Sequence, residues 1–157
     1  MADDENARQY GVFMPNELIT DDILNDLLSD NSMATYDDKG LGEEISLPHY
    51  AKQLIEKKKL KKSQVIHDAG LNQTFGYQIL AGTRRASRDK VIQLAFGLKA
   101  TLTEAQRLLK HAGLSELYVK NRRDAIIILA LENGLSLHQT NDELFRLGEN
   151  TIMDSME

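Results

Sequence analysis

The fold of this chain is decided by residues 62–90, KSQVIHDAGLNQTFGYQILAGTRRASRDK. Two helical runs lie in this stretch, one capped by Ser63 and ending at Gly70, the other capped by Asn72 and ending at Gly82. Capping side chains accept hydrogen bonds from the free N–H groups of a first helical turn, and glycine takes the left-handed conformation that ends a helix. We therefore predict two short helices joined by a tight turn, a helix-turn-helix. The apolar residues that they bury are Val65, Ile66, Ala69, Phe75, Ile79 and Leu80.

Three motifs lie in and around the turn: Ser63-Gln64, residues 69–74 (AGLNQT) and residues 82–85 (GTRR). An apolar helix is expected before these motifs and two after them, at residues 47–58, 87–98 and 103–111. Together they resemble the λ-repressor-like (Xre-type) helix-turn-helix of bacterial and phage regulators. The resemblance covers residues 46–113 and implies an all-α, five-helix domain. Residues 87–90 and 118–131 also resemble a Gram-positive subgroup of such proteins, some of which are encoded beside serine/threonine kinases.

Gly76 departs from the family pattern, which usually has an aliphatic residue in the middle of the second helix. Glycine inside a helix costs about 1 kcal/mol relative to alanine. Either Tyr77 or Phe75 fills the space, or this helix packs unusually close to its neighbour. The rotation of the second helix depends on which explanation holds, and so does the set of side chains that it exposes.

The second helix of a DNA-binding helix-turn-helix enters the major groove with its first turn. The resemblance implies that Gln73 reads a base there, while Gln64 lies against a phosphate and braces Gln73. A glutamine amide suits adenine because it can donate to N7 and accept from N6 at once. The plainer alternatives are that Gln73 only caps its own helix and that the arginines lie in a solvated loop. Expected base contacts are Gln73, Thr74, Tyr77 and Gln78, and expected phosphate contacts are Gln64, Lys62, Arg84, Arg85, Arg88 and Lys90.

Charge is segregated along the chain, although the net charge is only −5. Residues 1–44 carry −10, residues 46–123 carry +11 and residues 124–157 carry −6. A basic region that coincides with the helix-turn-helix is what a polyanion-binding module needs, because phosphate contacts supply most of its sequence-independent affinity. We therefore expect double-stranded DNA as the partner. The lysine run at residues 57–62 is either a solvated helix end or a further phosphate contact.

The expected organisation has four segments: an acidic tail at 1–44, the DNA-binding domain at 45–113, a C-terminal helical extension at 114–148 and a tail at 149–157. We expect the acidic tail to be partly disordered and to hold a short amphipathic helix around residues 19–28. Three alternatives are open for this helix: it docks on its own domain, it docks on another protein, or it stays disordered. The C-terminal extension either enlarges the core or forms the surface of a homodimer.

Local signals place the remaining helix starts. Residues 125–131 (AIIILAL) are expected to form a helix that is apolar nearly all round and central to its layer, because Asn121 can cap it and Gly134 follows it. Capping boxes are expected at Thr103 with Gln106 and at Ser136 with Gln139.

Catalytic and metal-binding patterns are missing from the sequence. There is no cysteine, and the four histidines never stand three or four residues apart. No glycine-rich phosphate loop or nucleophile elbow occurs. We expect no enzymatic activity, no cofactor and no metal. The acidic start is not a signal peptide and no apolar run could span a bilayer, so we expect a soluble cytoplasmic protein.

The leading hypothesis is a sequence-specific DNA-binding regulator of transcription, modulated by its acidic tail. The alternative is an adaptor that binds another protein through the same scaffold and that is linked to a kinase. The acidic segment could also cover the basic face and compete with phosphate until a partner removes it. If a kinase acts on this segment, its expected sites are Thr20, Ser29, Ser32 and Thr35.

Overall fold

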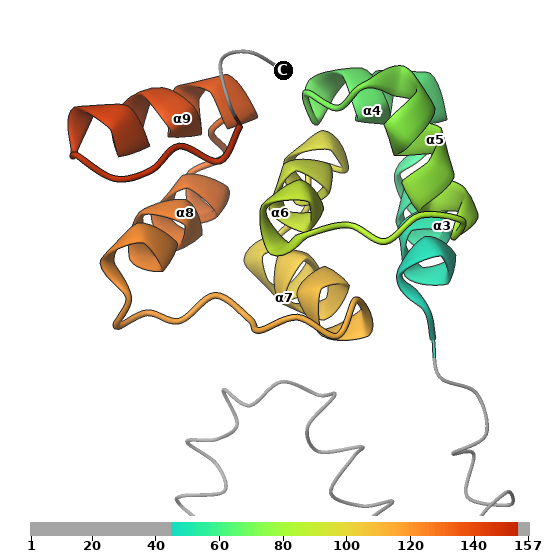
Figure 1. Cartoon of the computed structure of the whole chain (residues 1–157), viewed down its shortest axis with the longest axis horizontal. Coiled ribbons are helices and arrows are strands. Elements are labelled where there is room, and N and C mark those ends of the chain that lie inside the picture. Colours follow the sequence, from blue (N-terminus) through green and yellow to red (C-terminus); the bar gives the residue numbers. More distant parts are fainter. Residues whose placement is uncertain (1–44, 154–157) are drawn as a thin grey trace, which may run out of the picture. The chain divides into compact units, whose positions relative to one another are not determined.

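A computed structural model describes residues 45–153 of the chain, and every element in this range is a helix (Figure 1). The seven helices confirm the all-α prediction for this part of the chain. The amphipathic helix expected around residues 19–28 and the four expected phosphorylation sites lie outside the described residues.

The first three helices are α3 (Leu47–Lys58), α4 (Lys62–Asp68) and α5 (Gln73–Ala81). Asn72 caps α5 as predicted, because its side-chain oxygen accepts a hydrogen bond of 3.1 Å from the N–H of Phe75. Gly82 ends α5 with a φ of 83°, also as predicted. The cap predicted at Ser63 is wrong: the N-cap of α4 is Lys61, two residues earlier, and no side chain caps the helix.

The central pair is α6 (Arg88–Gly97) and α7 (Leu102–His111). The capping box at the start of α7 is formed by Thr101 and Glu104, so the prediction of Thr103 with Gln106 is wrong. Both pairs fit the same three-residue spacing. Gln106 is used differently, because its amide donates to the carbonyl of Leu117 (3.0 Å) and accepts from its N–H (2.7 Å).

The last two helices are α8 (Arg122–Glu132) and α9 (Leu137–Arg146). The predicted cap at Asn121 and the predicted capping box of Ser136 with Gln139 are both confirmed. The expectation that α8 is central to its layer is only partly right. Ile127 is fully buried, but Leu129 is 61% exposed.

The described helices form three groups (Figure 1). The group α3, α4 and α5 lies at one side, α6 and α7 lie in the middle, and α8 and α9 lie at the other side. Helix α6 connects the groups, since it packs against α4, α7 and α9. All of its residues from Val91 to Gly97 are buried, so most of the core is built around this helix.

Close packing explains Gly76, which is buried where α5 meets α4. A Cβ atom at this position would lie 2.5 Å from Cγ2 of Ile66, closer than real side chains approach. The second of the two explanations offered for Gly76 is therefore the right one. Tyr77 is 41% exposed and does not fill the space. Phe75, predicted to be buried, is only half-buried.

None of the helices in residues 45–153 combines the length and apolarity that crossing a membrane requires.

Candidate nucleic-acid interface

Helix α5 exposes the polar side chains of its first two turns. Gly76, Ile79 and Leu80 face the core, and a helix turns by about 100° per residue. Thr74, Tyr77 and Gln78 therefore lie away from this side, and Gln73 is exposed in the first turn of α5. Of the four predicted base-contact residues, Gln73, Thr74 and Tyr77 are exposed and Gln78 is half-buried.

Arg84 lies beside this face of α5. Its Nη1 atom is 3.5 Å from Oε1 of Gln78, a long hydrogen bond, and its guanidinium carbon is 5.0 Å from the centroid of the Phe75 ring. The ammonium of Lys90 lies 5.9 Å from the same ring. A cation over an aromatic face is attracted by about 0.5–1 kcal/mol at an exposed site. Phe75 therefore helps to hold Arg84 next to the amide of Gln78, and it also attracts Lys90.

Two further predicted cations are exposed. Arg85 follows Arg84 in the loop between α5 and α6, and Lys62 lies at the start of α4. No carboxylate in residues 45–153 forms an ion pair with Arg84, Arg85 or Lys62. Their charges are not neutralised by the described part of the protein.

Gln64 does not brace Gln73 as the resemblance implied. Its amide Nε2 donates a 2.9 Å hydrogen bond to Oδ1 of Asp68, one turn later in α4. Burial by itself would raise the pKa of the Asp68 carboxyl, but the hydrogen bonds from Gln64 and Lys99 lower it below its usual value. Gln64 remains exposed at the start of α4.

The lysine run at residues 57–62 separates into two kinds of side chain. The ammonium of Lys58 lies 2.7 Å from Oε1 of Glu104 and donates to the carbonyls of Leu98 and Lys99, so it stabilises the end of α6. Burial would raise the pKa of Glu104, but the hydrogen bonds from Lys58 and from the N–H of Thr101 lower it. Lys59, Lys61 and Lys62 are exposed.

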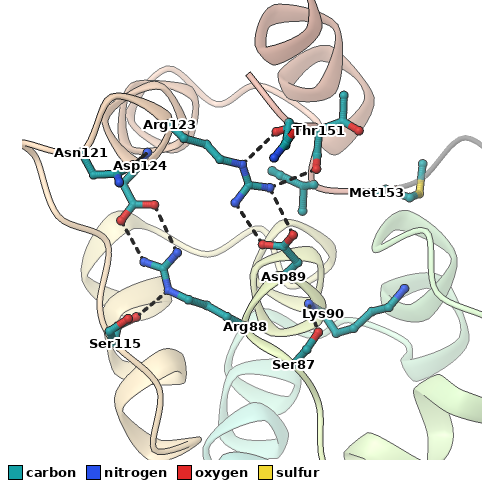
Figure 2. A network of polar contacts seen from close by, with 12 residues as sticks. Ser87, Arg88, Asp89, Lys90, Ser115, Asn121, Arg123, Asp124, Thr151 and Met153 are labelled. Carbon is teal, nitrogen blue, oxygen red and sulfur yellow. Dashed lines mark hydrogen bonds and ion pairs between the residues drawn. The ribbon is translucent and has the colours of Figure 1, made fainter. Parts of the chain in front are cut away.

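Arg88 is engaged within the protein and does not form part of this surface (Figure 2). Its Nη1 and Nη2 atoms donate to the two carboxylate oxygens of Asp124, at 3.2 and 2.9 Å. Nε and Nη2 also donate to the carbonyls of Ser115 and Glu116. All three nitrogens are therefore used, and we withdraw the prediction that Arg88 contacts a phosphate.

A second ion pair also joins α6 to α8, but here the arginine belongs to α8 and the aspartate to α6. Arg123 of α8 donates to both oxygens of Asp89 of α6, at 3.1 and 3.2 Å, and also to the carbonyls of Asn150 and Thr151 (Figure 2). Each helix start thus supplies one arginine and one aspartate to the other. Lys90 extends away from this network.

Gln93 has a structural role that we did not predict from the sequence. It is fully buried in α6, and its amide donates to the carbonyl of Ala69 at 2.9 Å and, at 3.4 Å, to that of Gly70. These carbonyls belong to the turn between α4 and α5. Gln93 therefore fixes the turn to the core, and a polar residue inside the apolar run VIQLAF was the signal for it.

The arrangement brings together groups that can bind a partner through hydrogen bonds and through charge. Uncharged hydrogen-bonding groups on α5 lie next to Arg84, which forms no ion pair with a carboxylate of residues 45–153. Residues 45–153 contain no group of three or more histidine, aspartate or glutamate side chains placed to hold a metal ion.

Comparisons of the chain with known protein families, with curated proteins and with solved structures gave no match.

Proposed function

We propose that this protein is a sequence-specific DNA-binding regulator of transcription in which α4 and α5 form a helix-turn-helix. The observation that carries the proposal is the position of Arg84 beside Gln78, on the exposed polar side of α5. Amide groups that can read base edges and a cation that can hold a phosphate are therefore presented together. The order of α3 to α7 further supports a λ-repressor-like plan.

Base reading is assigned to α5. Gln73 and Thr74 lie in its first turn, the part of a recognition helix that meets base edges, and both are exposed. Tyr77 and Gln78 follow one turn later. An amide that pairs with adenine through two hydrogen bonds contributes about 1–3 kcal/mol of discrimination against the wrong base.

Phosphate binding is assigned to Arg84, Arg85 and Lys62, together with the amide of Gln64, and Lys90 remains a candidate beside Phe75. Such contacts set the position and orientation of a protein on the duplex without reading its sequence. They also release counterions, so they make affinity fall with salt concentration.

The proposal is tested by comparing two variants on a selected duplex and on random duplex of the same length. We expect Gln73→Ala to reduce the preference for the selected duplex, because it removes a base contact. We expect Arg84→Ala to weaken both complexes alike and to lower the salt slope by about one unit. Equal effects of the two substitutions on both duplexes would refute this division of roles.

Gly76 gives no support to the adaptor alternative, because close packing against Ile66 explains this departure from the family pattern. If the full chain shows no preference among DNA sequences and no salt-dependent affinity for DNA, the adaptor role becomes the better explanation.

The acidic residues 1–44 are proposed to modulate DNA binding by competing with phosphate for the basic surface. Residues 45–157 form a compact unit by themselves, so a fragment that starts at Glu44 is suitable for comparison. We expect this fragment to bind random duplex more tightly than the full chain at low salt, with the difference decreasing as salt screens the charges. Equal affinities would exclude inhibition by the tail.

A further inference from the structure

A groove of about 640 Å³ lies between α8 and α9. Ile126, Leu129 and Ala130 of α8 provide apolar lining, and the α9 side carries Asp142, Glu143 and Arg146. Leu129 is 61% exposed, and no other part of the described chain covers it. The two helices form the group at the end of the molecule away from α5 (Figure 1).

The sequence of α8 explains why this surface is apolar. Its run AIIILAL has no polar side, and only one side can face the core. Ile127 and Ala130 take the inner positions, which leaves Leu129 outside. A helix that is apolar all round is normally buried on all sides. Among residues 45–153, no element covers the exposed side of α8.

We propose that a second copy of this chain covers the α8–α9 groove, in a symmetric homodimer. In a two-fold interface the same patch meets itself, so it must carry both a projection and the hollow that receives it. Leu129 provides the projection, and the groove beside it provides the hollow.

The charges at the groove favour a second copy over the acidic N-terminal segment. The α9 side carries both signs, since the guanidinium of Arg146 lies 2.7 Å from a carboxylate oxygen of Glu143 and Asp142 lies nearby. A two-fold arrangement can place Arg146 of each copy opposite the acids of the other. Residues 15–31 contain five acidic residues and no basic residue, so Asp142 and Glu143 would repel them.

The ion-pair network gives such a dimer a consequence for DNA, and this step rests on the proposed function. Arg88–Asp124 and Asp89–Arg123 join α8 to α6 directly after the loop that carries Arg84 (Figure 2). The end of the described chain also reaches the turn between α4 and α5, where a Cβ atom at Gly70 would clash with Met153. Two copies joined at α8 and α9 would therefore hold two α5 helices at one fixed separation. Helix-turn-helix proteins need such a separation to bind half-sites about one helical turn apart.

Sedimentation velocity of the full chain without DNA tests the dimer. We expect a dimer that dissociates at concentrations between about 1 and 100 µM, as small interfaces commonly do. Leu129→Asp should weaken dimerisation at least about tenfold, because it places a charge in an apolar interface. Val119→Asp is the matched control, since Val119 is 67% exposed but lies outside the groove, and it should leave the dimer unchanged.

Chemical crosslinking provides a second test that does not depend on the stability of Leu129→Asp. The chain has no cysteine, so Asn133→Cys at the groove and Val119→Cys outside it each give one reactive thiol. With a short bifunctional maleimide, we expect a covalent dimer from Asn133→Cys and much less from Val119→Cys.

Three results would overturn the dimer: a wild-type chain that is monomeric throughout this concentration range, a dimer unaffected by Leu129→Asp, or equal crosslinking from both thiols. These measurements contain no DNA. They can therefore refute the dimer while DNA binding is confirmed, or confirm the dimer while DNA binding is refuted.

Discussion

Arg84 and Arg88 are four residues apart in the sequence, but their guanidinium groups have opposite surroundings. Arg84 lies in the exposed loop after α5, next to an amide and an aromatic ring, and no carboxylate of residues 45–153 pairs with it. Arg88 opens α6 and makes four hydrogen bonds inside the protein, two of them to Asp124. Positive charge in a sequence is therefore not the same as positive charge that is available to a partner.

The same contrast occurs in the lysine run. Lys58 stabilises the end of α6 and pairs with Glu104, while Lys61 and Lys62 are exposed. We expect arginine and lysine side chains that connect helices to contribute to stability, and exposed ones without a carboxylate partner among residues 45–153 to contribute to the proposed DNA binding. Each of the following measurements tests whether a residue contributes to the stability of the fold or to the proposed DNA binding.

Removing Asp124 should have the largest effect on stability. Asp124 is 5% exposed and pairs with Arg88, and it also accepts a hydrogen bond from the N–H of Tyr118. Asp124→Ala leaves a partly buried guanidinium without its carboxylate, so we expect the free energy of unfolding to fall by about 3 kcal/mol. Urea unfolding measures this loss. Glu132→Ala, an exposed acid on the same helix, should change it by less than about 0.5 kcal/mol. Similar losses from both substitutions would contradict the assignment of Arg88.

Glu104 should make stability depend on acidic pH. The pKa of its carboxyl is lowered in the folded protein, so its contribution is complete above the usual value of about 4.3 and is lost as the pH falls through the lowered pKa. Glu104→Gln removes a charged hydrogen bond to Lys58, and we expect a loss of about 1.5–3 kcal/mol at pH 7. Unfolding curves between pH 7 and acid conditions should converge for the wild type and Glu104→Gln. A constant difference at all pH values would show that the charge of Glu104 is not the cause.

Arg84 and Arg88 should differ in their effect on the salt dependence of DNA binding. Arg84→Ala should lower the slope of affinity against salt by about one unit, because one phosphate contact is lost. Arg88→Ala should leave the slope unchanged, although it destabilises the fold. Titration of one duplex at several salt concentrations, with both variants kept below their unfolding transitions, gives the two slopes. A lower slope for Arg88→Ala would return Arg88 to the phosphate-binding set.

Phe75 should have the smallest effect. Phe75→Leu keeps an apolar side chain next to the core but removes the ring that attracts Arg84 and Lys90. We expect a loss of about 0.5–1 kcal/mol in the free energy of unfolding. If Phe75 also positions Arg84, affinity should fall equally for selected and random duplex. A loss restricted to the selected duplex would instead make Phe75 part of base recognition.

Features set by neighbouring residues could be predicted from the sequence. The caps at Asn72 and Asn121 and the end of α5 at Gly82 depend on a few positions each, and all three are correct. Thr101 and Thr103 both fit a capping box, so local spacing could not decide between them. In the structure, Thr101 with Glu104 forms the box, and Gln106 holds the connection after α7 through two hydrogen bonds with Leu117.

Features set by distant residues could not be predicted. The partner of Arg88 lies 36 positions away in α8, and only the packing of α8 on the central helices brings it close. The run AIIILAL contains no polar residue that would show which side faces out, so the exposure of Leu129 was not visible in it. Gln64 is a different case, because its partner Asp68 stands one helical turn away and was visible in the sequence.

The central claim is that α5 reads the sequence of DNA. Its most direct test is to select bound duplexes from a random pool with the full chain, at a stated salt concentration, and then to measure the affinity for a selected and a random duplex. We expect the selected duplex to bind at least about 10³-fold more tightly, in the range found for specific regulators. Equal affinities for both duplexes would contradict the claim.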